Sequence, residues 1–475
     1  MSRQLPEPWR DQAPPDLKPH PDAPHIHIRS YRVITPLFGG GVETQQADPL
    51  TTVRSSAVRG HLRFWWRATR AGRYGPDEAG LKQMKKAEDR LWGSTENQSL
   101  VQVEVQQTSP GIEIRSYRDG VRTRYLGDPT SPLSYAAFPL RRTDDRPMPG
   151  GLRFGVSFDL AIMLPGDPEL KADVLAALWA WETFGGIGAR TRRGFGALHC
   201  HRVQGAAEVG PWQPSVHHAD DVTRWLNAAL LHYVLPGQAP QGVPMLSPTG
   251  KLKVGDNAAV HTFADGDPQR RIPAFEPKLL KLFADSGKRD GVSDDLVMPL
   301  VVWYYAIDRL KEFRQRRRQS TSRPDPQSRF GRSYWPEPDE IRRRTTGFCG
   351  RHNKQLSVTR KFPRAVFGLP MVFQFKDGLG QRDSEGIDPP NTTLQGAKHD
   401  RMASRLIVRP LACANERWAS VAVVLEGPDL PPDGLKLEGD QTIVPLVTDS
   451  LTNAEANFPP LRGKTDVLQA FLDTL

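Results

Sequence analysis

Residues 152–203 contain a strand, a helix and a second strand, and this order constrains the fold more than any other feature. Every second residue of Leu152–Leu164 is large and apolar, which predicts one strand with a single buried face. Asp167 and the proline after it supply a helix cap and a first helical position, and apolar residues follow at helical spacing up to Phe184. Glycines end that helix, and 197–203 predicts the closing strand.

The preceding residues complete a larger pattern. Residues 26–34 alternate as a strand, 56–70 have apolar residues on one side of a helix, and 101–106 alternate strictly as a second strand. The order strand, helix, strand, strand, helix, strand is the ferredoxin-like arrangement, which RRM-type RNA-binding domains also use. We therefore expect an α+β fold with a ferredoxin-like domain over 25–205.

The rest of the chain divides by composition. Residues 1–24 are polar and rich in proline, which predicts a flexible leader that is neither a signal peptide nor a membrane anchor. The arginine-, proline- and serine-rich stretch 119–151 predicts a long excursion or protruding arm. We expect 206–346 to be mostly helical, with a long helix near 298–318. Beta-rich sequence at 365–375, 406–410 and 421–425 predicts a second, more irregular domain over 347–475.

Composition narrows the function. The chain has 475 residues, 64 basic against 54 acidic side chains and a formal charge of +10, which suits a polyanionic partner. Cys200, Cys349 and Cys413 lie far apart, which argues against a disulfide framework or a cysteine zinc site and favours a reducing cytoplasm. No apolar run has membrane-spanning length, so we expect a soluble protein without a membrane partner.

A loop over 185–196 combines five glycines with three arginines. Glycine allows close approach to the backbone and arginine adds fixed positive charge, a combination that suits a phosphate backbone. A nucleotide-binding P-loop fits poorly, because no Lys-Ser/Thr pair follows the glycines and the loop ends a helix instead of beginning one. The alternative is a structural turn that packs the helix against its sheet.

The first helix predicts a second basic element. Four arginines fall within about 80° of the helical wheel, away from the apolar side, and a triple glycine and two serines precede or begin this helix. A solvated basic face is the alternative, and the arginine runs 314–318 and 342–344 are equally ambiguous. The candidate RNA-binding residues are Gly39, Gly40, Gly41, Ser55, Ser56, Arg59, Arg63, Arg67, Arg70, Gly186, Gly188, Arg190, Arg192, Arg193, Gly194 and Gly196.

Histidines do not form a convincing catalytic or metal site. His61 lies roughly opposite the arginine stripe, so it is poorly placed as a catalytic base. His25 and His27 on the first strand could share a sheet face with His199 and His201 on the last, but an exposed polar face is favoured over a metal site because no carboxylate or cysteine ligand accompanies them. We predict no catalytic residue, metal or cofactor.

Several motif blocks carry a family resemblance. The segments 34–41, 54–67 and 88–94, followed by the pattern Gly, apolar, Gly, five residues, Gly, apolar, Gly from Gly186, resemble the RAMP family of CRISPR proteins, in the branch that supplies subunit one of the type III-B Cmr complex. Residues 332–337, 362–370 and 400–407 resemble its C-terminal blocks, although Arg405 stands where a proline is expected. The resemblance covers about 30 to 430.

The resemblance implies two ferredoxin-like domains and a place at the end of the complex distal to the guide tag. It also implies contact with the 3′ region of guide RNA (crRNA), with single-stranded target RNA and with other RAMP subunits of the complex. Cleavage and signalling belong to other subunits, so the chain would be a non-catalytic binder. The alternative is a metal-independent, guide-processing endoribonuclease of the same superfamily with a histidine base. Those enzymes tend to carry the glycine-rich loop near the C-terminus, whereas here a long second half follows it.

Overall fold

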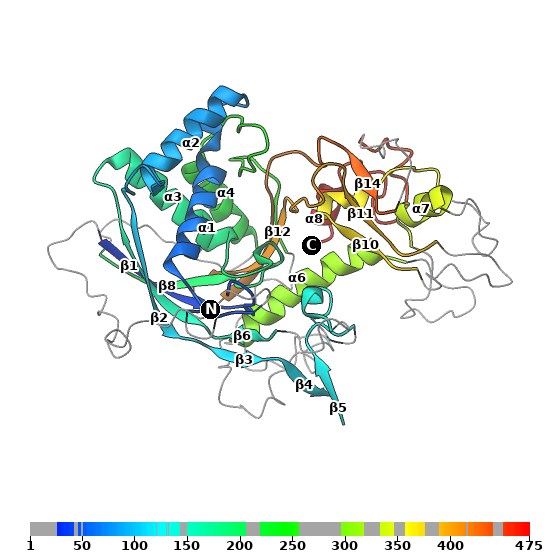
Figure 1. Ribbon diagram of the computed structural model, residues 1–475, viewed down its shortest axis with the longest axis horizontal. Coiled ribbons are helices and arrows are strands. Elements are labelled where there is room, and N and C mark those ends of the chain that lie inside the picture. Colours follow the sequence, from blue (N-terminus) through cyan, green and yellow to red (C-terminus); the bar gives the residue numbers. More distant parts are fainter. Residues whose placement is uncertain are drawn as a thin grey trace.

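The computed structural model is a mixed α+β structure built on antiparallel sheets. Figure 1 shows two lobes side by side, with β1 and α1 in one, β10 and α7 in the other, and α6 running between them. Among the helices that the structure describes, none has the length and apolarity needed to cross a bilayer. The structure describes residues 26–41, 46–48, 51–119, 121–129, 131, 133–142, 150–205, 219–255, 296–317, 333–345, 357–375, 389–414, 417–439 and 450–475. The predicted leader, 1–24, lies outside these ranges.

The first lobe holds a four-stranded antiparallel sheet in the order β2-β7-β1-β8. Two helices, α1 (Ser55–Arg70) and α3 (Pro168–Phe184), pack against each other over its apolar face. The strands are β1 (Ile26–Val33), β2 (Gln102–Ser109), β7 (Ser157–Met163) and β8 (Leu198–Gln204). The predicted order of strands and helices holds for β1, α1, β2, β7, α3 and β8, with a further helix, α2 (Glu78–Trp92), between α1 and β2. Asp167 caps α3 through the N–H groups of Glu169 and Leu170.

The single strand predicted over Leu152–Leu164 is wrong. The structure has two strands there, β6 (Leu152–Phe154), which pairs with β3 (Ile112–Ile114), and β7 in the main sheet. Between them Gly155 has φ +69°, a left-handed conformation that turns the chain from one sheet into the other. Alternation continues through this turn because both strands bury apolar side chains, so the pattern alone does not reveal the break.

The 119–151 region is only partly a projection. The hairpin of β4 (Ser116–Asp119) and β5 (Arg122–Tyr125) extends from the lower edge of the molecule (Figure 1). Several residues that follow it are buried in an apolar cluster with α6 (Val297–Gln315). They include Leu133, which precedes the short helix η3 (Phe138–Leu140), and Leu140 within that helix. Among the described residues of this segment, the part that follows the hairpin is therefore packed onto the body of the protein.

The remaining strands form two three-stranded sheets, β12-β13-β9 and β10-β11-β14. β9 comes from the region expected to be mostly helical, yet it pairs with β13, so the first of these sheets uses residues from both sides of the predicted boundary at 346. The division of the second half into a helical region, 206–346, and a separate domain, 347–475, stays a prediction. The remaining bounds are α4 (Ala219–Tyr233), α7 (Glu337–Thr345), α8 (Val467–Leu472), η9 (Pro363–Phe367), β9 (Leu252–Val254), β10 (Met371–Phe373), β11 (Thr392–Gly396), β12 (Leu406–Cys413), β13 (Arg417–Val424) and β14 (Leu435–Leu437).

One buried arginine connects the sheet β12-β13-β9 to the first lobe. Arg409 on β12 has no exposed surface, and its guanidinium donates hydrogen bonds to the carbonyls of Gly185 at 2.6 Å and Leu198 at 2.8 Å. These carbonyls lie where α3 ends and where β8 begins. Burial lowers the pKa of Arg409 to about 9. Buried carbonyls need hydrogen-bond donors, so Arg409 holds both ends of the glycine loop against the second half of the chain.

Replacing Arg409 with methionine leaves both carbonyls without a donor. Because an unsatisfied buried polar group costs about 1–3 kcal/mol, we expect R409M to lower the free energy of unfolding by about 2–5 kcal/mol. Urea unfolding followed by tryptophan fluorescence measures this. R224M, at an exposed arginine of α4, is the control and should change stability by less than about 0.5 kcal/mol. Equal midpoints for R409M and the parent protein would contradict the structural role.

Candidate nucleic-acid interface

Two glycine-rich segments that are far apart in the sequence lie against each other. A β-carbon placed on Gly39 would lie 3.0 Å from the β-carbon of Ala189, and one on Gly40 would lie 3.7 Å from the Cα of Gly188. The Ala189 N–H donates to the Phe38 carbonyl at 2.8 Å. Gly39, Gly40 and Gly188 all have left-handed backbone, and Gly40 is exposed. The two predicted glycine motifs therefore form one strip of main chain without bulky side chains.

The other loop glycines have a structural role. A β-carbon on Gly196 would lie 1.8 Å from the Ile187 carbonyl oxygen, and one on Gly194 would lie 2.5 Å from the Trp303 ring. The Ile187 N–H donates to the Gly196 carbonyl at 2.9 Å, which closes the base of the loop around buried Gly186. The turn interpretation therefore holds for this base, while residues 188–192 remain half-exposed.

The three loop arginines have different environments. Arg193 is buried and donates to the carbonyls of Leu406 and Phe367, each at 2.9 Å, and burial lowers its pKa to about 9. Arg192 is half-buried, donates to the Ser404 carbonyl and lies 5.7 Å above the Phe64 ring. Arg190 is half-buried too. Because all partners of Arg193 belong to the protein interior, we leave it out of the candidate interface.

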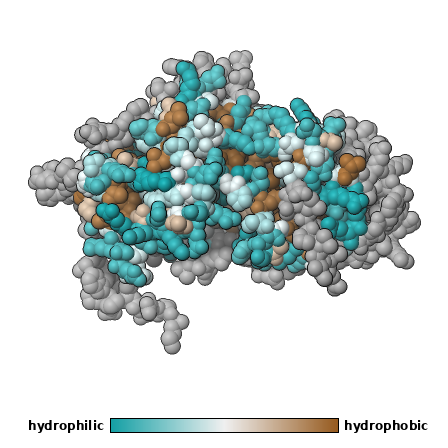
Figure 2. Space-filling model, turned by 90° about the horizontal axis from the view of Figure 1, so that it is seen from above, coloured by the Kyte–Doolittle hydropathy of each residue, from teal (hydrophilic) through white to brown (hydrophobic). Residues whose placement is uncertain are grey.

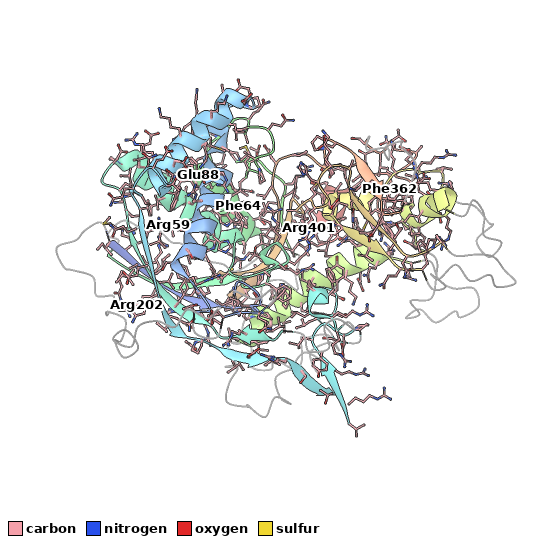
Figure 3. The ribbon with its side chains drawn as sticks, viewed as in Figure 1. Arg59, Phe64, Glu88, Arg202, Phe362 and Arg401 are labelled. Atoms are coloured by element: carbon pink, nitrogen blue, oxygen red, sulfur yellow. The ribbon has the colours of Figure 1, made fainter. Side chains whose placement is uncertain are left out.

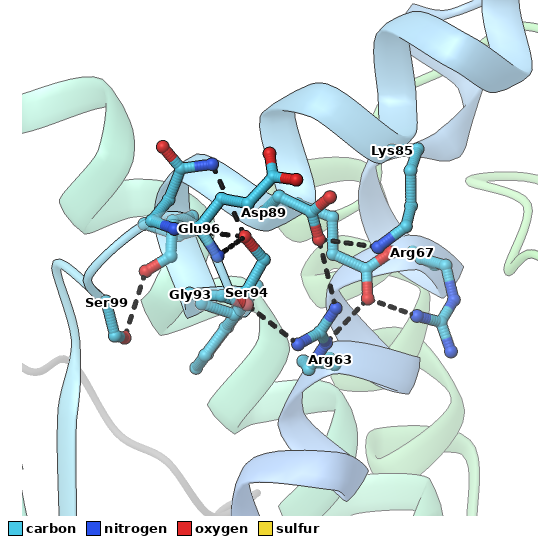
Figure 4. A network of polar contacts seen from close by, with 12 residues as sticks. Arg63, Arg67, Lys85, Asp89, Gly93, Ser94, Glu96 and Ser99 are labelled. Atoms are coloured by element: carbon cyan, nitrogen blue, oxygen red, sulfur yellow. Dashed lines mark hydrogen bonds and ion pairs between the residues drawn. The ribbon is translucent and has the colours of Figure 1, made fainter.

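The arginine stripe on α1 is largely neutralised by α2. Arg63 Nε lies 2.7 Å and Arg67 Nη1 lies 2.5 Å from the same Glu88 Oε1, and Arg63 also donates to the Gly93 carbonyl (Figure 4). The Glu88 side chain is 5% exposed, whereas those of Arg63 and Arg67 are 26% and 30% exposed. The stripe is therefore neither a bare basic face nor fully internal. The sequence analysis missed α2, which supplies this carboxylate.

The two ends of the stripe behave differently. Arg70 is buried, with Nε 2.5 Å from Asp173 Oδ1 of α3 and Nη2 donating to the Ala172 carbonyl, so it joins two helices and is also left out of the interface. Arg59 is half-buried and donates to the Trp92 carbonyl at 3.4 Å. Figure 3 places Arg59 and Phe64 on α1.

The start of α1 adjoins the glycine strip. Arg54, which the sequence analysis did not single out, donates to the Gly40 carbonyl. Ser55 Oγ accepts a hydrogen bond from the Val105 N–H at 3.1 Å, Ser56 is exposed, and no side chain caps the helix. The first N–H groups of a helix lack intrahelical partners and favour anions. We define the glycine surface as Gly39, Gly40, Gly41, Arg54, Ser55, Ser56, Arg59 and Gly188 to Arg192. Figure 2 shows mainly hydrophilic residues on the upper face, with smaller apolar groups between them.

The histidines do not converge on one face of the sheet. Arg32 pairs with His199 and Tyr31 with Cys200, so His199 lies on the face opposite to His27, which has the register of Tyr31. The expectation of a shared face fails for these two, and His25 lies outside the described residues. Within the described ranges no group of three His, Cys, Asp or Glu could hold a metal ion. His61 is half-buried with its ring stacked 6.4 Å from that of Trp181, and burial lowers its pKa.

Comparison with known proteins identifies relatives. The sequence model of the RAMP superfamily matches residues 30–199. The CRISPR system Cmr subunit Cmr1-1 of Pyrococcus furiosus is 30% identical over 159 residues, which span 33% of this chain and 42% of that subunit. Cmr subunit Cmr1-2 of the same organism is 27% identical over 182 residues, 36% of this chain and 92% of that one. The chain therefore aligns with less than half the length of the first relative.

Two solved structures overlap this one weakly. The crystal structure of apo Cmr1 from Pyrococcus furiosus has a TM-score of 0.43 at 15% identity and covers 86% of this chain and 89% of its own. A cryo-EM structure of the type III-B Cmr-beta complex bound to cognate target RNA contains a chain with a TM-score of 0.43 at 10% identity, covering 86% of this chain and 96% of its own. We draw nothing further from overlaps of this size.

His27, which is buried, and His199, which is half-buried, predict a pH dependence of stability. Burial first, and then nearby cations, lowers the pKa of His27 and of His199 to about 4, against an ordinary value of 6.5. Between these values the unfolded chain binds more protons than the folded one, so stability should fall as the pH falls from about 6.5 towards 4. Urea midpoints at pH 7.5, 6.0 and 5.0 measure this. The variant H27Q/H199Q should show a flatter profile, and identical profiles would contradict the assignment.

Proposed function

We propose that this chain is a non-catalytic, RNA-binding subunit of a type III-B CRISPR Cmr effector complex, because the sequence model of the RAMP superfamily matches residues 30–199. In this role it contacts the 3′ region of the guide RNA and the target RNA in antiviral defence, beside other RAMP subunits, in the cytoplasm. The two Cmr1 relatives support the assignment to this complex over the aligned segment. The net charge of +10 agrees with an RNA partner.

The glycine surface is the observation that carries this proposal. It combines an exposed, side-chain-free backbone at Gly40 with the uncapped start of α1 and the guanidinium groups of Arg54, Arg59 and Arg192. Main-chain N–H groups and arginines are the usual donors to phosphates, and they carry no base preference. A guide-RNA binder has to accept any spacer sequence, so contacts of this kind suit it.

The second half of the chain fits the same proposal. The chain order β9, α6, β12, β13 repeats the order β1, α1, β2, β7 of the first lobe. Within the sheet, β12, β13 and β9 are neighbours in the same order as β2, β7 and β1. α6 packs against β12 and β13, as α1 and α3 cover the first sheet. We infer that this unit, built on β9, α6, β12 and β13, is a second ferredoxin-like domain.

The endoribonuclease alternative receives less support. Its best histidine, His61, is half-buried with its ring stacked on that of Trp181. The loop also lies near the middle of the chain and not near its end. Incubating the full chain with repeat RNA in the absence of metal distinguishes the two functions. Specific cuts that disappear in H61A would overturn the non-catalytic assignment.

Removing two accessible cations tests the RNA-binding function. We expect R54A/R59A to weaken the binding of an unstructured single-stranded RNA about tenfold at low salt and to reduce the slope of log affinity against log salt by about 1.4, since each phosphate contact contributes about 0.7. Fluorescence anisotropy across a salt series measures both values. R224A, an exposed arginine of α4, is the matched control. Unchanged affinity and slope in R54A/R59A would refute the glycine surface as the RNA contact.

Glu88 provides a test in the opposite direction. In E88Q the partly exposed Arg63 and Arg67 lose the negative charge that neutralises them. We expect the free energy of unfolding to fall by about 1–3 kcal/mol, because charge-assisted hydrogen bonds are weakened. RNA affinity should rise at low salt if these arginines face the ligand. Lower stability with unchanged affinity would restrict Arg63 and Arg67 to a structural role.

A further inference from the structure

Arginines and aromatic rings from α6, the glycine loop and residues 135–138 form a cluster. Arg314 of α6 donates to the Tyr135 hydroxyl at 2.9 Å and lies 5.2 Å above the Phe367 ring. Arg190 of the glycine loop lies 4.8 Å above the Phe138 ring. Tyr135 and Phe138 belong to the segment 119–151, for which the sequence predicts a protruding arm. Arg314 belongs to the arginine run 314–318, for which the sequence leaves the role open. Packing brings all of them together.

Positive charge is in excess at this cluster. Burial and, after it, the charge of Arg314 lower the pKa of Arg190 to about 10, and both arginines also lower the pKa of Arg193. The nearby carboxylate of Glu337 is paired with Arg364 at 3.2 Å. The Nε groups of Arg190 and Arg314 are buried and make no hydrogen bond among the described residues. Half-buried cations that repel one another are stabilised by an anion between them.

Phe138 adds an aromatic surface to this charge. It is 57% exposed and is the only aromatic among the large apolar side chains that are exposed in the described part of the chain. Arg190 covers one face of its ring, and the remaining exposed area is accessible to a ligand. An exposed ring beside arginines is the arrangement with which proteins stack bases of single-stranded nucleic acid and hold the adjoining phosphate.

The backbone of Arg190 strengthens this interpretation. Arg190 has φ 57° and ψ 32°, the left-handed conformation, in a loop where glycine occupies most other positions of this kind. A residue with a β-carbon is strained in this conformation, whereas glycine is not. The strained conformation directs the Arg190 guanidinium onto Phe138.

We propose that Arg190, Arg314 and Phe138 bind one nucleotide of single-stranded RNA, with the phosphate between the two guanidinium groups and the base stacked on the Phe138 ring. This inference rests on the proposed RNA-binding function but uses contacts separate from Arg54 and Arg59. The site has no built-in preference for one base, because every base offers a stacking face.

The experiment separates stacking from charge in the full-length protein. Fluorescence anisotropy with a 12-nucleotide unstructured RNA should show about tenfold weaker binding for F138A with an unchanged salt slope, because stacking carries no charge. R190G should reduce the slope by about 0.7, the value for one phosphate contact. Glycine at a left-handed position relieves strain, so R190G is not expected to unfold the protein.

Matched controls are available in the same chain. R462G makes the same backbone change at Arg462, the second non-glycine residue with positive φ in the described part of the chain, and L231A removes a comparably exposed apolar side chain from α4. Both should bind RNA like the parent protein. If F138A and R190G also bind like the parent while R54A/R59A binds weakly, this nucleotide site is refuted and the proposed function stands. If the parent protein does not bind the RNA, both are refuted.

Discussion

Two buried arginines that reach across the molecule in opposite directions determine the shape of the glycine loop. Arg409 of β12 donates to the carbonyls of Gly185 and Leu198, on either side of the loop, while Arg193 inside the loop donates to the carbonyls of Leu406 and Phe367. Neither has a carboxylate partner among its hydrogen bonds. Their donors satisfy main-chain acceptors that would otherwise be buried alone. The loop therefore cannot keep its conformation independently of the second half of the chain.

The same dependence links the motif blocks that are scattered along the sequence. The blocks at 362–370 and 400–407 supply the carbonyls that hold the loop, and the block at 88–94 begins with the glutamate that binds two arginines of α1. Each block is short and irregular, and each contributes a polar group to a shared framework. This framework leaves Gly188 to Arg192 at the surface and keeps the base of the loop buried.

The sequence predicted correctly those features of the fold that depend on residues close together in the chain. The strand order of the first sheet, the Asp167 cap and the end of α3 at Gly185 are confirmed, because alternation, capping and glycine termination act over a few residues. The break at Gly155, the opposite faces of His27 and His199, and the burial of Arg70 and Arg193 depend on contacts between distant segments. Glu88 lies on α2 and Asp173 on α3, so the helical wheel of α1 could not show which of its arginines are neutralised.

Arginine serves two purposes in this chain, and the net charge does not distinguish them. Its rigid fork of donors suits buried carbonyls as well as phosphates, so Arg409 and Arg193 add to the sequence charge without being accessible to a ligand. Glu88 and Asp173 offset others inside the first lobe. Among the described residues, Arg54, Arg59, Arg190 and Arg314 form no ion pair with a carboxylate, and they lie at the two places that we propose to bind RNA. Binding by few, well-placed cations implies a modest salt dependence and leaves room for stacking to contribute.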